Sequence, residues 1–200
     1  MIFALAPQTP APKRPAPKPP VSRPSAPKSP APKPTAPKPS SPKTAVATSP
    51  PQLPPLNAAV VAYCEARIGQ KVARGECAEL AHEALVASRA VSFTGESPKP
   101  GDYVWGKLVA TIKPGGLGEA VKVLPGDIVQ YRDVVFERRT PNSWSRSSAS
   151  HHTSVIAAAR PGAWTLYEQN VNGRRTVGRS EVTLTDLKSG TLWVYRPLPK

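Results

Sequence analysis

The 200-residue sequence has few of the residues that mark disulfide-rich or membrane proteins. Its 2 cysteines are too few for a disulfide framework, so the cysteine count does not assign the protein to an oxidising compartment. The longest early apolar run covers only residues 1–6, whereas a membrane-spanning helix needs about 20 apolar residues in succession. The sequence therefore excludes an integral membrane protein, and we expect no membrane span.

Acidic side chains are missing from residues 1–55, and this absence marks a boundary in the chain. The same segment holds 19 of the 27 prolines and carries a net charge of +8, while residues 56–200 contribute +6. We predict a disordered Pro/Lys/Ala-rich tail at 1–55 and one domain at 56–200, which is close to the most common domain size. The positive excess in both parts favours anionic surroundings.

The tail repeats units of the Ala-Pro-Lys-Pro type, a composition that cannot build a hydrophobic core. Proline favours the polyproline II conformation, which predicts an extended spacer. Two partner classes remain open for residues 7–55. Arg14, Pro17 and Pro20 have the spacing that polyproline-binding domains accept, and the lysines would bind an anionic polymer by counterion release. Nucleic acid is not favoured as that polymer, because nothing in the domain resembles a base reader.

Residues 1–6 read like the end of a secretory signal, because Ala4, Leu5 and Ala6 match the small-x-small cleavage pattern. However, no basic residue precedes the run, and a signal core needs about 7–15 apolar residues. If translation starts upstream of Met1, we expect a secreted or cell-envelope protein that has retained a remnant of its signal here. If Met1 is the true start, we expect a cytoplasmic protein.

Two helices are expected at the start of the domain. Apolar residues recur at helical spacing over 56–68 and predict an amphipathic helix that Gly69 ends. Cys64 lies within that apolar set, so we expect a buried thiol there. A second helix should begin at Cys77 and reach about residue 85. Backbone N–H groups at a helix start favour an anion, so the Cys77 thiol should be shifted towards the reactive thiolate.

Strands and turns are predicted for most of the remaining sequence. A Pro-Gly-Asp turn leads into a strand at 128–131, and a second alternating stretch covers 134–137. The polar, Ser-rich residues 138–150 suggest a loop. Further strands are expected at 151–157, 164–170 and 192–195. Helices followed by an antiparallel sheet predict an α+β fold.

The alternation of side chains along these strands limits which residues can meet Cys77. A thiolate nucleophile needs an imidazole to accept and return its proton, and a polar group to orient that imidazole. His151 and His152 should point to opposite faces of their strand, so at most one of them can face the thiol. Glu168 and Asn170 should share a face of the next strand. The sequence thus predicts a catalytic set of cysteine, histidine and one of these two polar residues.

Four motifs carry a family resemblance: Gly-x-Cys at a helix start, Pro-Gly-Asp-Ile-Val, His-Thr-Ser-Val-Ile and Glu-Gln-Asn, in that order. Over roughly residues 60–170 the sequence resembles the CHAP family of cysteine, histidine-dependent amidohydrolases and peptidases, which implies a papain-like fold. The resemblance implies Cys77 as the nucleophile, His152 as the base and Glu168 or Asn170 as the group that orients it. His152 is preferred over its neighbour because it directly precedes the hydrophobic strand.

A narrower similarity extends over nearly the whole domain. Residues 75–81, 104–106, 169–173 and 193–197 resemble a cysteine-proteinase-fold domain at the C-terminus of fungal actin-patch (myosin tail-interacting) proteins and in Pro-rich plant proteins. This similarity supports the fold more strongly than an activity. The sequence departs from the pattern at Ala78, where a Trp is expected, and the smaller side chain would open or reshape the wall beside the nucleophile.

An oxyanion donor and a metal site have weaker support. The backbone N–H of Cys77 is the natural donor to an oxyanion, and Gln70 is a candidate for a second donor, as a Gln is in papain-like enzymes. The sequence contains no Cys-x-x-Cys pair and no two His residues four positions apart, so we expect no metal site. No cofactor is expected either.

These observations favour a cysteine-dependent amide hydrolase, an amidase or peptidase. The alternative is a non-catalytic interaction module of the same fold, whose Pro-rich tail recruits partners. A peptide or peptidoglycan-like substrate fits the CHAP resemblance and the positive charge, whereas the narrower similarity to eukaryotic domains points away from peptidoglycan.

Overall fold

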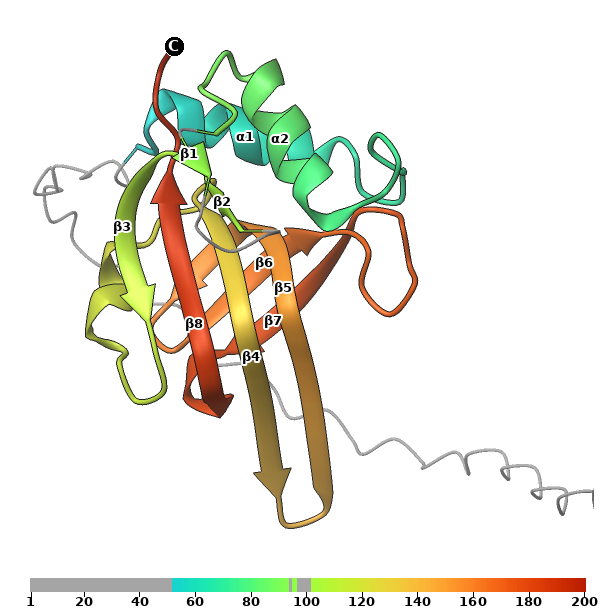
Figure 1. Ribbon diagram of the computed structural model, residues 1–200, viewed down its shortest axis with the longest axis vertical. Coiled ribbons are helices and arrows are strands. Elements are labelled where there is room, and N and C mark those ends of the chain that lie inside the picture. The colour runs from blue at the N-terminus through green and yellow to red at the C-terminus, as the bar shows by residue number, and fades with distance from the viewer. Residues whose placement is uncertain (1–51, 94, 97–101) are drawn as a thin grey trace, which may run out of the picture. The chain divides into compact units, whose positions relative to one another are not determined.

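The computed structural model describes residues 52–93, 95–96 and 102–200. The predicted spacer, the Arg14 motif and the apolar run at 1–6 therefore lie outside the described residues. Two helices, α1 (Pro55–Glu65) and α2 (Cys77–Ala87), precede a six-stranded antiparallel sheet, which is the α+β fold that the sequence predicts (Figure 1). Within the described part of the chain, no helix is long and apolar enough to cross a membrane.

The large sheet has the order β3-β8-β4-β5-β6-β7. Its strands are β3 (Lys107–Ile112), β4 (Ile128–Thr140), β5 (Ser143–Arg160), β6 (Ala163–Glu168), β7 (Gly178–Thr183) and β8 (Leu187–Arg196). The short strands β1 (Gly95–Glu96) and β2 (Tyr103–Val104) form a separate pair, and two 3-10 helices, η1 (Gly118–Lys122) and η2 (Leu184–Asp186), lie in connections. Both α-helices lie at one end of the sheet, and the β4–β5 hairpin projects from the opposite end (Figure 1).

Both faces of the sheet are buried, because alternate side chains of the central strands enter two different hydrophobic clusters. Four strand residues pack with the helices: Ile128, Val155, Tyr167 and Tyr195. Their immediate neighbours belong to the second cluster: Val129, Ile156, Leu166 and Val194. The helices contribute buried side chains to the first cluster, among them Val60, Cys64, Leu80 and Ala84. The helical layer is therefore held against β4, β5 and β6, where the candidate site residues also lie.

The predicted Pro-Gly-Asp turn ties α1 to the sheet. Gly126 has a φ of 83°, and a Cβ there would lie 2.4 Å from the backbone oxygen of Asn57, so only glycine fits. The buried carboxylate of Asp127 accepts hydrogen bonds from Asn57 Nδ2 (2.8 Å) and Arg196 Nε (3.1 Å). Because the guanidinium compensates the buried charge, this network fixes α1, β4 and β8 together.

Two predictions of secondary structure were wrong. The first helix ends at Glu65 rather than at residue 68, and Ile68 instead forms an isolated bridge with Val177. Residues 138–150 are not a loop, because β4 and β5 pair without interruption from their turn to the Ile128–Val155 pair, apart from one unpaired position in each strand. Residues 138–150 form the outer part of the β4–β5 hairpin, where most side chains on both faces are exposed. The sequence there has no apolar alternation that would have predicted strands.

Candidate active site

Cys77 is the first residue of α2, as the sequence predicts. The Glu79 carboxylate accepts hydrogen bonds from the backbone N–H groups of Glu76 (2.9 Å) and Arg74 (2.8 Å), which fixes the start of the helix. The backbone N–H of Cys77 has no acceptor within the helix, because the first turn of any helix lacks one. The thiol therefore lies where a helix favours negative charge.

The loop that precedes Cys77 is held by Gln169, which is fully buried. Its Oε1 accepts a hydrogen bond from Val72 N (3.2 Å), and its Nε2 donates to Val72 O (3.1 Å) and Glu76 O (2.8 Å). All these bonds link the end of β6 to the loop, so the sheet positions the nucleophile. The sequence analysis gave Gln169 no role; the one available signal is that side chains alternate along a strand, which puts Gln169 on the face opposite to Glu168.

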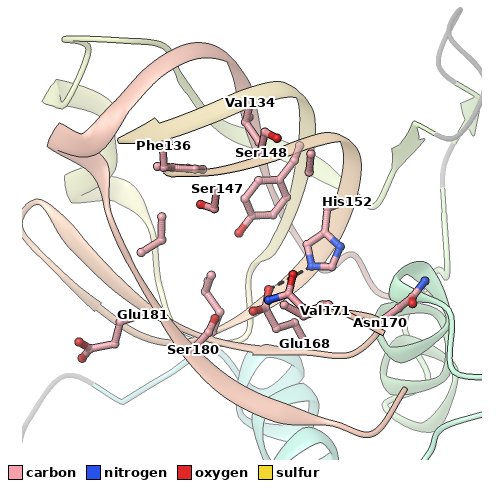
Figure 2. A pocket seen from close by; sticks show the side chains of 15 residues that line it. Val134, Phe136, Ser147, Ser148, His152, Glu168, Asn170, Val171, Ser180 and Glu181 are labelled. Atoms are coloured by element: carbon pink, nitrogen blue, oxygen red, sulfur yellow. Dashed lines mark hydrogen bonds and ion pairs between the residues drawn. The ribbon is translucent and has the colours of Figure 1, made fainter. Parts of the chain in front are cut away.

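His152 of β5 lies between Cys77 and Glu168. Its Nε2 donates to Glu168 Oε2 (3.0 Å; Figure 2). The other ring nitrogen, Nδ1, is then left to interact with the thiol. The side chain is only 14% exposed. Burial alone would lower the pKa of His152, but its hydrogen-bond interactions with Cys77 and Glu168 outweigh burial and raise the pKa to about 9. The imidazole is therefore protonated at neutral pH.

The pKa of the Cys77 thiol is shifted in the direction opposite to that of His152. Burial would raise the pKa of Cys77, but the hydrogen bond and charge of His152 outweigh burial, and so do hydrogen bonds from the backbone of Thr153 and Ala78. The pKa of Cys77 consequently lies below its ordinary value. A lowered thiol pKa beside a raised imidazole pKa is the signature of a thiolate–imidazolium ion pair.

Glu168 ends β6, and its carboxylate is the group that orients His152. Burial would raise the pKa of Glu168, but hydrogen bonds from His152 and Ser180 and the positive charge of Arg174 help to lower it. The carboxylate therefore stays ionised although its side chain is 8% exposed. An ionised acceptor fixes the ring and stabilises its protonated form.

Asn170, the other candidate for this orienting role, has a different partner. Its Nδ2 donates to Glu76 Oε2 (2.7 Å), and Glu76 Oε1 also forms an ion pair with Arg175 (2.8 Å). Because β6 ends at Glu168 and Asn170 has a φ of 61°, the alternation that would give both residues one face does not reach Asn170. The structure thus brings together Cys77, His152 and Glu168, and places Asn170 at their border.

Gln70 is exposed in the segment that follows α1, and its Nε2 donates to the backbone oxygen of Ala66 (3.2 Å). The side-chain amide that was a candidate oxyanion donor therefore contacts the C-cap residue of α1. The backbone N–H of Cys77 is the donor that the geometry places at the thiol itself.

A pocket of about 330 Å³ opens beside His152, on the face of the sheet that carries the second hydrophobic cluster (Figure 2). We call it the His152 pocket. It is lined by Tyr131, Val134, Phe136, Ser147, Ser148, Ala149, His152, Leu166, Glu168, Asn170, Val171, Asn172, Ser180, Glu181 and Val182. In the described ranges, no three His, Cys, Asp or Glu side chains are grouped so that they could hold a metal ion.

The chain is similar to a family of cysteine proteinase-fold domains, to part of a longer protein and to solved structures. The family model described as "AIM3/BBC1 Cysteine proteinase-fold domain" matches residues 56–200. A protein of Debaryomyces hansenii named "Altered inheritance of mitochondria protein 3" is 30% identical over 144 residues, which cover 70% of this chain but only 16% of that protein. Two solved structures cover 70% of this chain and 62% of their own, "The crystal structure of Ly7917" (16% identity, TM-score 0.46) and "The crystal structure of Ly7917 with the hydrolyzing product of MDP" (17%, 0.43).

Proposed function

Because this chain belongs to the AIM3/BBC1 cysteine proteinase-fold domain family, we propose that it is a cysteine-dependent hydrolase of amide bonds. One observation carries the proposal: the buried His152 imidazole is hydrogen-bonded to the Glu168 carboxylate (3.0 Å), and interaction with the same imidazole lowers the pKa of the Cys77 thiol. Nucleophile, base and orienting group are thereby assembled as covalent catalysis requires. The substrate class is an amide within a peptide or a peptidoglycan-like peptide.

The first half of the reaction forms a thioester. The Cys77 thiolate attacks the carbonyl carbon of the amide, and a C–S bond forms while the carbonyl oxygen takes up negative charge. The backbone N–H of Cys77 donates to that oxygen. The His152 imidazolium then gives its proton to the amide nitrogen, the C–N bond breaks, and the amine leaves.

The second half restores the enzyme. Neutral His152 accepts a proton from a water molecule, whose oxygen attacks the thioester carbonyl. The C–S bond breaks, the carboxylic acid leaves, and the thiolate–imidazolium pair is regenerated. Glu168 holds the ring in one orientation and remains ionised through both halves.

The test compares the full chain with its Cys77→Ala variant on a library of peptides that release a fluorescent amine. We expect Cys77→Ala to fold normally and to lose turnover by at least about 10³-fold, because no other nucleophile can form the thioester. Equal rates for the parent and the variant would overturn the assignment. A parent that hydrolyses no peptide and alkylates Cys77 no faster than Cys64 would favour the non-catalytic interaction module.

A further inference from the structure

The His152 pocket shares two of its lining residues with the candidate site, and Cys77 lies outside its lining. His152 and Glu168 form part of its wall, and Asn170 lies at its border (Figure 2). A carbonyl carbon bonded to Cys77 would stand within reach of His152, so the substituent next to that carbonyl lies beside the pocket. The pocket is therefore placed to select among amide substrates, provided that the site cleaves amides as proposed.

The floor of the pocket is apolar. It is formed by Tyr131, Val134 and Leu166 of β4 and β6, each of which is less than 5% exposed. The Tyr131 hydroxyl is hydrogen-bonded to Ser154 Oγ (2.8 Å), so this hydroxyl already has a partner. A buried apolar surface favours an apolar group by about 25 cal/mol for each Å² removed from water.

Carboxylates line the pocket, and the cations beside them are already engaged. Arg160 forms an ion pair with Glu181 (3.2 Å), and the charge of Arg174 acts on Glu168. The lining contains the carboxylates of Glu168 and Glu181 and includes no Lys or Arg, although residues 56–200 hold 19 basic side chains. His152 is already paired with the Glu168 carboxylate and the thiol. An incoming carboxylate would lose hydration and meet Glu168 and Glu181, whose neighbouring cations are already engaged by these two carboxylates.

The size of the pocket limits the group that fits. About 330 Å³ lies at the lower end of the range for small-molecule sites, which suits one large side chain better than an oligomer. Ser147, Asn172 and Ser180 supply uncharged hydrogen-bonding groups to the lining.

From these observations, and resting on the proposed amide chemistry, we propose that the His152 pocket binds an uncharged apolar or aromatic side chain next to the scissile carbonyl and rejects acidic ones. The amide of a phenylalanine or leucine residue is then a substrate, and the amide of an aspartate residue is not.

The test measures binding to the full chain carrying Cys77→Ala, so that it needs no turnover. The probes are N-acetyl-phenylalanine amide and N-acetyl-aspartate amide, titrated by NMR at neutral pH. We expect the phenylalanine probe to bind at least about tenfold more tightly, because only its ring gains from the apolar floor. Equal affinities of the two probes would overturn the proposal.

Two lysine substitutions locate the effect. Ser147 and Ser145 lie two residues apart on one face of β5, and both are exposed, but only Ser147 lines the pocket. Ser147→Lys should remove most of the discrimination against the aspartate probe, whereas Ser145→Lys, which adds the same net charge, should leave it unchanged. An identical effect of both variants would show that net charge rather than the pocket discriminates.

The proposed function has its own, separate readout. The ratio of the alkylation rates of Cys77 and Cys64 in the parent chain depends on the ion pair and not on the pocket. A high ratio with equal probe affinities rejects the pocket assignment alone, and a ratio near one with clear discrimination rejects the amide chemistry alone.

Discussion

The two cysteines of this domain belong to the same helical layer, yet their surroundings give them opposite chemistry. Cys64 lies within α1, has no exposed surface, and burial raises its pKa to about 12. Cys77 is also largely withdrawn from water, but the pKa of its thiol is lowered because His152 donates a hydrogen bond and a positive charge. Burial alone thus makes a thiol inert, and the partner on β5 makes the other one reactive.

The largest expected effect comes from His152→Ala, which should make Cys77 resemble Cys64. Without the imidazole, burial dominates the pKa of Cys77, so alkylation by iodoacetamide should require a higher pH. Amide turnover should fall by about 10²- to 10⁴-fold, because the general acid and base is lost. The measurement is the rate of Cys77 alkylation against pH, followed by mass spectrometry. An unchanged pH midpoint would mean that His152 does not form the ion pair.

Glu168→Gln should reduce the difference between Cys77 and Cys64 without abolishing it. The His152 imidazolium is needed to protonate the leaving amine. Because the pKa of His152 is about 9, amide turnover in the parent should fall as the pH rises through 9. Removing the carboxylate lowers that pKa and moves this fall to lower pH. We expect a loss of about 10- to 100-fold at neutral pH, since a hydrogen bond to a charged group contributes about 1.5–3 kcal/mol.

The pH profile of turnover measures this effect, and alkylation by iodoacetamide is its control because alkylation needs no acid. A variant whose turnover falls at the same pH as in the parent would contradict the role of Glu168.

Gln169→Leu tests whether the sheet positions Cys77. The substitution leaves the N–H and carbonyl of Val72 and the carbonyl of Glu76 without their partner, at a cost of about 1–3 kcal/mol of unfolding free energy. If Gln169 positions the nucleophile, the pH midpoint of Cys77 alkylation should rise as well. A chain that is destabilised but keeps the parental midpoint would restrict Gln169 to a structural role.

Cys64→Ala should have the smallest effect on stability and turnover, which would confirm that of the two cysteines only Cys77 takes part in the chemistry. It removes one buried sulfur atom, so we expect a loss of about 1 kcal/mol of unfolding free energy, as for the removal of a single buried methyl group. Turnover and Cys77 alkylation should keep parental rates, which thermal unfolding and mass spectrometry would check. A fall in turnover at equal folded fraction would show that Cys64 takes part in the chemistry.

The helices and the nucleophile's position were predictable because their signals are local. Helix formers after a Gly-containing turn were enough to predict that α2 begins at Cys77. The choice between Glu168 and Asn170 was not predictable, because it depends on β6 ending at Glu168 and on the left-handed backbone of Asn170. The β4–β5 ribbon was missed for a different reason: pairing across a hairpin stabilises it, and its exposed Ser and Arg residues carry no apolar period.

The place of β8 in the sheet has a consequence for biosynthesis. Cys77, His152 and Glu168 all precede β8 (Leu187–Arg196) in the chain, but β8 lies between β3 and β4 and completes the middle of the sheet. During synthesis the nucleophile, base and carboxylate therefore leave the ribosome before the sheet that aligns them can close. The six-stranded sheet is therefore complete only after β8 has been made, and domains generally fold as whole units during synthesis.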